Sequence, residues 1–334
     1  MPTAKRPLPA KLRPLLTLAG LIALFYLTAF SWVATAPQPL LRVATNVWPG
    51  YETLYLARSL GLFGSAPIRL VEMTSASQVS HALQNGAVEA AALTLDEAIA
   101  AMQQDGVDLR VVLVLDSSDG ADTLLARDGI DTVAGLRGKR IGVENTATGA
   151  VLLDAALQSA GLDIGQVSIA PMTVNDHLAA WQQGGIDAVV TFEPFRSRIL
   201  AAGARELFSS RQIPGRILDV LVVRADVLAA HREALRSLVA GHFAALAYFS
   251  ANPSDAAQRM APRLGVAADR VLPLFEGLKL PDRSANREWL AGAEPELARV
   301  AAELAQLMLQ HRLIANPVAT ANIAAAEFVA EPQR

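Results

Sequence analysis

The chain has 334 residues, of which 52% are hydrophobic and 18% charged, so it is long enough for two lobes with buried cores. It contains no cysteine, which excludes disulfides, iron–sulfur clusters, thiolate zinc sites and thiol nucleophiles. The formal net charge is −3, and because the first fourteen residues carry four basic side chains, the remainder is more acidic still. We therefore expect no nucleic-acid partner, since phosphate binding needs a basic surface on the folded part.

The N-terminal residues have the pattern of an export segment. Residues 1–14 form a basic end, and residues 15–36 form an apolar run without a charged side chain. A cleaved signal peptide has an apolar region of about 7–15 residues, whereas a run of about 20 residues crosses a membrane as a helix. Residues 34–36, Ala-Thr-Ala, fit a cleavage site, but Pro37 follows them directly. We favour a membrane anchor over a cleaved signal peptide, with the basic end in the cytoplasm and the rest on the periplasmic or extracytoplasmic face of the inner membrane.

From Leu40 onward, short apolar runs alternate with helical patterns. This alternation is typical of βα units around a mostly parallel sheet, so an α/β fold is predicted. The predicted strands of the first set are residues 41–45, 68–73, 90–93 and 109–115, and its predicted helices are residues 52–60, 77–84 and 96–104.

A second set begins after Asp128-Gly129 and repeats the same rhythm. Its predicted strands are residues 140–143, 167–170 and 188–192, and its predicted helices are residues 149–160, 175–183 and 194–202. Residues 217–223 then form another apolar strand, and the pattern up to His311 is almost wholly helical. The second set therefore looks inserted into the first.

This order predicts two lobes: lobe 1 from residues 40–122 plus 222–330, and lobe 2 from residues 123–221. Two extended crossings, near residues 121–126 and 219–223, would join them. Ligands of open α/β sheets bind outside the carboxyl ends of the strands, so two facing lobes enclose a site. Closure about the hinge around a ligand is the expected motion.

Several motifs in a fixed order resemble those of one protein family. They are Asn46-Val-Trp-Pro-Gly-Tyr-Glu with Leu56-Ala-Arg and Gly61-Leu-Phe, Leu83-Gln-Asn-Gly with Ala90-Ala-Ala-Leu-Thr-Leu-Asp-Glu, Gly138-Lys-Arg-Ile-Gly-Val-Glu, and Asp187-Ala-Val-Val-Thr-Phe-Glu-Pro. Over residues 40–320 the chain resembles the periplasmic nitrate/sulfonate/taurine-type substrate-binding proteins of ABC importers, a group similar to thiamine-pyrimidine-precursor binding proteins. The resemblance implies a two-lobed periplasmic-binding-protein-like type II fold with two crossing strands. It also implies a protein that holds a solute unaltered in its cleft and presents it to an ABC permease and ATPase.

The turn after the first strand offers aromatic side chains to the predicted cleft. Asn46 leaves the strand, and the Pro49-Gly50 pair turns the chain so that Trp48 and Tyr51 lie beside the cleft. An indole and a phenol at this place could stack on a planar or cationic solute. The alternative is that Trp48 fills the core of lobe 1.

Hydroxyl and acidic groups near the other strand ends have two interpretations. Ser75 and Thr94 can cap the next helix or donate to a ligand. Thr94 and Glu97 have the spacing of a capping box, so Glu97 is interpreted as a cap, and Asp176 has the same spacing after a threonine. Asp96, beside the box, is open to both interpretations.

The two predicted crossings carry carboxylates. Residues 116–122 should lie at the floor of the cleft, which makes Asp116, Ser118 and Asp122 candidate ligand-binding residues, with a solvated polar turn as the alternative. Asp219 interrupts an apolar strand, where a carboxylate needs a partner, so it is a pocket or hinge-bond candidate.

In lobe 2, Glu144 follows a strand and Thr146 opens the next helix. The free N–H groups of a helix start favour an anion, which Glu144 contradicts. Glu144 either points away, neutralises a cation, or orients the amine of a zwitterion. Glu193, at the end of another strand, is a candidate ligand or an acid at a helix start.

Carboxylates thus dominate the predicted cleft, whereas lysine and arginine are nearly missing from its loops. A nitrate or sulfonate binder would be expected to offer helix starts and basic or hydroxyl donors. The residues instead favour an amine or a zwitterion. Both possibilities stay open.

No catalytic motif stands out in the chain. It lacks a Gly-x-Ser-x-Gly elbow, a phosphate-binding Gly-rich loop and a His-Glu-x-x-His pair, and its five histidines are scattered. We therefore expect a monomeric binding protein rather than an enzyme, with no cofactor and no metal. The alternatives are a tethered ligand-sensing receptor domain and a pyrimidine-synthase-like enzyme.

Overall fold

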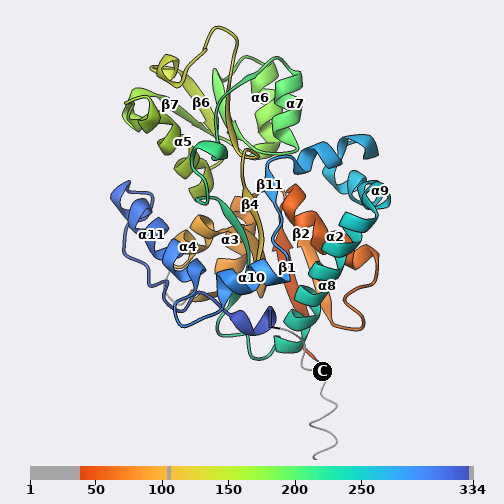
Figure 1. Ribbon diagram of the computed structural model, residues 1–334. Helices are drawn as coiled ribbons and strands as arrows, with labels where there is room; N and C mark the ends of the chain where they lie inside the picture. The colour runs from red at the N-terminus through yellow and green to blue at the C-terminus, as the bar shows by residue number, and fades with distance from the viewer. Residues whose placement is uncertain (1–37, 104–106, 331–334) are drawn as a thin grey trace, which may run out of the picture. The chain divides into compact units, whose positions relative to one another are not determined.

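The computed structural model describes residues 38–103 and 107–330, which contain two β-sheets with helices packed around them (Figure 1). The segment of residues 15–36, predicted to be an anchor or signal peptide, lies outside the described residues. Among the helices that are described, none is both long enough and apolar enough to cross a membrane.

The first sheet forms the centre of lobe 1 and has the spatial order β11-β4-β10-β3-β1-β2. Its strands are β1 (Leu41–Thr45), β2 (Ile68–Glu72), β3 (Ala90–Thr94), β4 (Leu109–Ser118), β10 (Leu218–Arg224) and β11 (Leu278–Lys279). β1 pairs in parallel with β2 and β3, whereas β10 is antiparallel to both β3 and β4. All five residues of β3 are buried, which explains its continuous apolar sequence in place of an alternating one.

The second sheet forms the centre of lobe 2 and has the order β7-β6-β8-β5-β9. Its strands are β5 (Thr123–Ala126), β6 (Arg140–Val143), β7 (Ser168–Pro171), β8 (Ala188–Thr191) and β9 (Arg205–Ser209). Successive residues of a strand point to opposite faces, so Leu124 and Leu125 join different apolar clusters on the two faces of this sheet. Lobe 2 thus has cores of its own.

The helices divide between the two lobes. In lobe 1 they are α2 (Glu52–Ser59), α3 (Ala76–Gln84), α4 (Leu95–Ala101), α8 (Arg232–Ala251), α9 (Pro253–Leu264), α10 (Arg283–Leu290) and α11 (Glu296–Gln310). In lobe 2 they are α5 (Ala147–Ser159), α6 (His177–Gln182) and α7 (Phe195–Ala201). Helices α8 and α9, cyan in Figure 1, pack against α2, and α11 packs against α4, so late segments of the chain complete the lobe that the early segments begin.

The chain crosses between the lobes at residues 119–122 and 210–217. The predicted boundary at residues 221 and 222 falls inside β10, which belongs to the first sheet along its whole length because it pairs with β3 and β4. The two crossings are bonded to each other: the hydroxyls of Ser118 and Ser210 are 2.8 Å apart, and the Gly120 N–H donates to the Ser210 Oγ at 2.6 Å. These bonds hold the two connections between the sheets together.

Arg263 on α9 ties the C-terminal helices to the start of the chain. Its guanidinium forms ion pairs with Glu52 and Glu72 and donates to the Asn46 carbonyl at 2.7 Å. It also lies 3.7 Å from the centre of the Tyr55 ring, close enough for a cation–π contact. The loop that follows β1 is therefore held from behind by a side chain that comes more than two hundred residues later.

Candidate functional site

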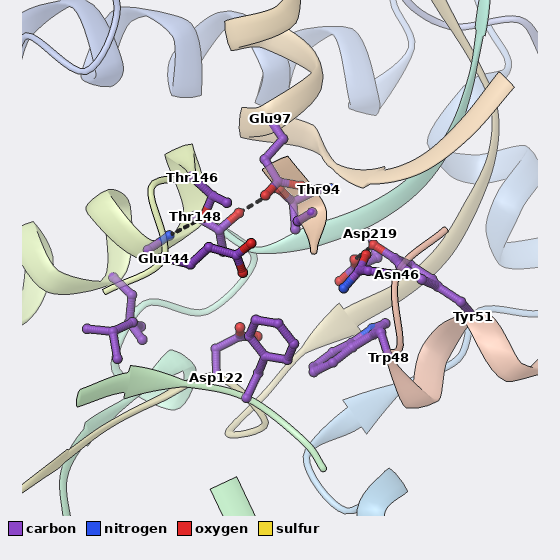
Figure 2. A pocket seen from close by; sticks show the side chains of 15 residues that line it. Asn46, Trp48, Tyr51, Thr94, Glu97, Asp122, Glu144, Thr146, Thr148 and Asp219 are labelled. Atoms are coloured by element: carbon purple, nitrogen blue, oxygen red, sulfur yellow. Dashed lines mark hydrogen bonds between the residues drawn. The ribbon is translucent and has the colours of Figure 1, made fainter. Parts of the chain in front are cut away.

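A pocket lies where the loops at the ends of β1, β3 and β10 meet the start of α5 and the end of β8. Figure 2 shows Asn46, Trp48, Tyr51 and Asp219 gathered on one side of it. The cavity has a volume of about 40 Å³. The lining residues are Asn46, Trp48, Tyr51, Ala76, Thr94, Glu97, Asp122, Glu144, Thr146, Thr148, Gly149, Leu152, Val190, Phe192 and Asp219.

The Trp-Pro-Gly-Tyr turn forms one wall of the pocket. A short 3-10 helix (Pro49–Tyr51) starts at the extended residue Trp48, so the proline occupies a first helical position, where its missing N–H costs nothing. The Trp48 indole N–H donates to the Asp116 Oδ2 at 3.0 Å, and the Tyr51 hydroxyl donates to the Asp219 Oδ1 at 2.5 Å. Trp48 and Tyr51 are both buried in the core of lobe 1 and both line the pocket, so the two interpretations of Trp48 hold together.

Gly50 is required in this turn because other atoms come very close to it. A Cβ at this position would lie 1.7 Å from the Asp116 Oδ2 and 2.7 Å from the Trp48 Nε1. The absence of a side chain at Gly50 thus allows the bond between Trp48 and Asp116.

Phe192 brings an aromatic ring from lobe 2. Its ring centre is 5.5 Å from that of Trp48, and the two planes meet at 83°, an edge-to-face arrangement. Phe192 was not predicted from the sequence, in which the neighbouring Glu193 was the candidate at this strand end. Its position directly after β8, at the carboxyl end of a strand, was the available signal.

Three carboxyl groups lie at the lobe 1 end of the pocket. Asp116 and Asp219 are cross-strand partners in β4 and β10, and Asp122 follows on the first crossing. Burial raises the pKa of Asp116 and of Asp122 to about 7. Burial, together with the charge of Asp116, raises the pKa of Asp219 well above its usual range.

A second cluster of acidic side chains lies where α4 faces α5. Thr94 and Glu97 form the predicted capping box, and Glu97 also lines the pocket. Burial and the neighbouring Asp96 raise the pKa of Glu97 to about 8. Burial also raises the pKa of Asp96 and that of Glu144, which lies across the pocket on lobe 2. Figure 2 shows Glu144 across the pocket from Asp219.

The pocket is rich in carboxyl groups and lacks basic side chains among its described lining residues. Among the described residues that line it there is no lysine, arginine or histidine. Buried carboxyl oxygens near it have no hydrogen-bond partner, namely Asp96 Oδ2, Asp116 Oδ1, Asp122 Oδ2 and Glu144 Oε2. In the part of the chain that the structure describes, no group of acidic or histidine side chains is arranged to hold a metal ion. A solute with hydrogen-bond donors would complement this pocket.

The two lobes touch each other around the pocket. The hydroxyls of Thr94 and Thr148 are 2.6 Å apart, and Thr148 also donates to the Asp96 Oδ1 at 3.3 Å. Farther out, the Asn175 side chain donates to the Thr74 carbonyl at 2.8 Å. These bonds join the two lobes beside the pocket.

The candidate residues from the sequence are divided by the structure into two groups. Those that line the pocket are Asn46, Trp48, Tyr51, Thr94, Asp122, Glu144, Thr146 and Asp219. Those that do not line it are Ser75, Asp96, Asp116, Ser118, Asp176 and Glu193. Sequence reasoning did not single out Ala76, Thr148, Gly149, Leu152, Val190 and Phe192, and it treated Glu97 as a cap only.

Most of the residues outside the lining have a structural partner. Ser75 caps α3 by accepting from the Gln78 N–H, and the exposed Asp176 accepts from the Thr173 hydroxyl at 2.6 Å. Glu193 caps the start of α7, where it accepts from the Ser197 N–H and pairs with Arg196.

Asp116 and Ser118 were expected in a loop but belong to β4, which extends to Ser118. Asp116 lies behind Trp48, whose indole donates to it, and Ser118 bonds to Ser210 on the second crossing. Asp96 lies behind Thr148. These three residues support the pocket from outside its lining.

Two periplasmic proteins of Escherichia coli (strain K12) are similar to this chain. The identity to the taurine-binding periplasmic protein is 29% over 238 residues, which are 68% of this chain and 72% of that protein. The identity to the putative aliphatic sulfonates-binding protein is 29% over 194 residues, which are 56% of this chain and 59% of that protein.

Solved structures share the fold. The alkanesulfonate-binding protein SsuA from Xanthomonas axonopodis pv. citri, bound to MOPS, matches with a TM-score of 0.73 at 20% identity, over 86% of this chain and 98% of that one. The desulfurization enzyme DSZB matches with a TM-score of 0.63 at 18% identity, over 86% and 97%. The predicted α/β fold of periplasmic-binding-protein type is thereby confirmed, and the fold itself is found in binding proteins and in an enzyme.

A family model agrees with these likenesses. It covers residues 34–265, which is more than half of the chain, and it contains the Trp-Pro-Gly-Tyr turn and all of lobe 2. The resemblance predicted from the sequence motifs is confirmed: the chain belongs to the NMT1-like family.

Proposed function

We propose that this protein is the extracytoplasmic solute-binding component of an ABC importer. It captures a small organic solute between its two lobes by hinge closure and presents it, unaltered, to a permease and its ATPase. The observation that carries the proposal is a small pocket whose walls come from both lobes, with bonds between the lobes around it. Membership of the NMT1-like family and the two similar periplasmic binding proteins support it.

The solute is an amine or a zwitterion. Carboxyl groups line the pocket from both lobes, whereas the described lining has no basic side chain to neutralise an isolated anion. Trp48 and Phe192 add aromatic surface, which favours a cationic group through cation–π attraction. Taurine, the solute in the name of one relative, carries an ammonium group and fits this class as a zwitterion.

Two other functions remain as rivals. A pyrimidine-synthase-like or other enzyme is supported only by the fold that the desulfurization enzyme shares. A ligand-sensing receptor domain would use the same pocket but report to a partner protein. A neighbouring operon that encodes a permease and an ATPase would favour transport over sensing.

A thermal-shift screen tests the binding function. The panel holds ethylamine, taurine, ethanesulfonate, nitrate and an aminopyrimidine, each with the purified protein. A ligand at a hundredfold excess over its Kd adds about 2.7 kcal/mol to the free energy of unfolding. We expect stabilisation by an amine or a zwitterion and none by nitrate. Stabilisation by ethanesulfonate alone would contradict the proposed solute class, and turnover of the bound compound would contradict the binding function.

Small-angle X-ray scattering tests hinge closure. Thr148→Val keeps the shape of the side chain but removes the bonds to Thr94 and Asp96. We expect the variant to have a larger radius of gyration without ligand and to contract when the ligand from the screen is added. An unchanged radius in both states would contradict closure.

A further inference from the structure

Two carboxyl oxygens inside the pocket lack the hydrogen bonds that buried polar atoms normally make. Asp122 Oδ2 and Glu144 Oε2 are buried and accept no hydrogen bond, although both residues line the cavity. Their residues are 6% and 5% exposed. A buried carboxylate without a partner is strongly disfavoured, so in the empty pocket each group gains from carrying a proton.

Acidic groups around these two carboxyls further favour their protonated forms. Asp122 faces Asp96 on α4, Asp116 on β4 and Asp219 on β10. Asp122 also interacts with the hydroxyl of Ser118, which is neutral and cannot compensate a negative charge. Like charges this close cannot all be ionised in a buried site.

Glu144 is in the same situation on lobe 2. It faces Glu97 on α4 and interacts, at the start of α3, with the hydroxyls of Ser75 and Ser77 and with the backbone N–H groups of Ala76 and Ser77. The Ser77 hydroxyl reaches only one of its oxygens, at 3.5 Å. These hydroxyl and backbone N–H groups, all of them neutral, relieve its charge only in part.

Basic side chains on the adjoining crossing and helix are engaged elsewhere. Arg211 donates to the carbonyl of Asp119, and Arg196 pairs with Glu193 and Glu206. Neither residue lines the pocket. No positive charge within the described lining therefore compensates the six acidic groups, which are Asp96, Glu97, Asp116, Asp122, Glu144 and Asp219.

We infer that the pocket binds its solute by exchanging protons for positive charge. In the ligand-free protein below neutral pH, Asp122 carries a proton, and burial favours the protonated form of Glu144. When an ammonium group enters, a carboxyl O–H releases its proton to solvent, and the carboxylate pairs with the cation. For a simple cation such as ethylammonium, the release of one proton for each positive charge bound leaves the net charge of the site unchanged. This inference rests on the proposed function, because it needs an ammonium-bearing solute.

The pKa values of these groups support the direction of the exchange. Burial raises the pKa of Asp122 to about 7 and raises that of Glu144 as well. A cation therefore binds more tightly as the pH rises towards 7, because fewer protons have to leave. Far enough above these pKa values the affinity no longer depends on pH. An isolated anion would show the opposite trend, since it needs the carboxyls protonated.

Isothermal titration calorimetry measures the protons exchanged. Ethylammonium, taurine and ethanesulfonate are titrated at pH 6 in two buffers with different ionisation enthalpies, and the difference in apparent enthalpy counts the protons. We expect proton release with ethylammonium or taurine, and an affinity that rises up to about tenfold per pH unit below the pKa. An amine that binds without proton release overturns the exchange but leaves the proposed function intact. Proton uptake with ethanesulfonate also overturns it.

Infrared spectroscopy tests, without any solute, whether carboxyl groups of the pocket carry protons in the ligand-free protein. Protonated carboxylic acids have a carbonyl stretch distinct from that of carboxylates. We expect this band at pH 6, weaker in Asp122→Asn and in Glu144→Gln, and unchanged in Asp226→Asn, whose carboxylate is exposed and paired with Arg224. A ligand-free protein without the band contradicts the inference even if no probe binds.

Discussion

Asp116 and Asp219 lie opposite each other on the antiparallel strands β4 and β10, and each accepts a hydrogen bond from a different aromatic residue of one turn. Trp48 donates to Asp116, and Tyr51 donates to Asp219. The turn is thereby joined to the two strands that continue into the crossings between the lobes.

Gly50→Ala should disrupt this arrangement. The new methyl group would overlap the Asp116 carboxyl group and approach the Trp48 indole, so both side chains must move. We expect a loss of about 1–3 kcal/mol in the free energy of unfolding and weaker solute binding. Urea unfolding and calorimetry measure the two effects. Gly165→Ala is the matched control, since nothing lies within 4 Å of the added methyl group. Equal effects of the two substitutions would contradict the role of Gly50.

Asp122→Asn should separate binding from stability. The amide has the size of the carboxyl group but cannot supply a negative charge, so we expect amine affinity to fall at least about tenfold. The unfolding midpoint should stay the same or rise, because a buried ionisable group is removed. Asp226→Asn, at the surface, should change neither the affinity nor the midpoint by much. Unaltered amine binding in Asp122→Asn would contradict the role of Asp122.

The ligand-free protein should lose stability as the pH rises from about 4, the ordinary pKa of a carboxyl group, to about 8. The pKa of Glu97 is raised to about 8 and those of Asp116 and Asp122 to about 7, so the folded state binds these protons more tightly than the unfolded state. Such groups stabilise the fold at low pH, and their contribution is lost as the pH passes through the raised pKa values. Each group contributes up to about 1.4 kcal/mol per pH unit in that range.

Two buried histidines have the opposite effect on stability: they make the fold more stable as the pH rises, but only at lower pH. Burial lowers the pKa of His177 to about 4 and that of His242 to about 3, so their effect on stability is complete once the pH exceeds the normal histidine value of about 6.5. Thermal unfolding between pH 6.5 and 8.5, a range chosen from those pKa values, therefore isolates the carboxyl groups. A midpoint that is flat or rises over this range would contradict their assignment as protonated groups.

Replacing Arg263 should destabilise lobe 1. Its partner Glu52 is fully buried, so Arg263→Met leaves a buried carboxyl group without its cation, which costs about 3–5 kcal/mol in comparable pairs. It also releases the carbonyl of Asn46, a residue of the pocket wall, so weaker solute binding should accompany the loss. Arg259→Met on the same helix is the control, because its pair with Asp255 is exposed. Similar unfolding midpoints for the two variants would contradict the role of Arg263.

The alternation of strands and helices could be predicted from the sequence because the buried strands are continuous apolar runs. β9 and β11 were missed: the first begins with the polar pair Arg205-Glu206, and the second has only two residues. The acidic character of the pocket could be predicted as well, since acids follow strand ends. The position of Asp116 behind Trp48 could not, because it depends on a contact between residues 68 positions apart.

The position of β10 has a consequence for how the chain folds. β10 lies between β3 and β4 in space, yet it is made after the whole of lobe 2. Until residues 218–224 arrive, the apolar edges of β3 and β4 have no strand between them, whereas every strand of the second sheet already exists. Lobe 2 can therefore fold first, and lobe 1 stays vulnerable to aggregation until the last third of the chain is present. A chaperone that covers strand edges would be most valuable to this protein during that interval.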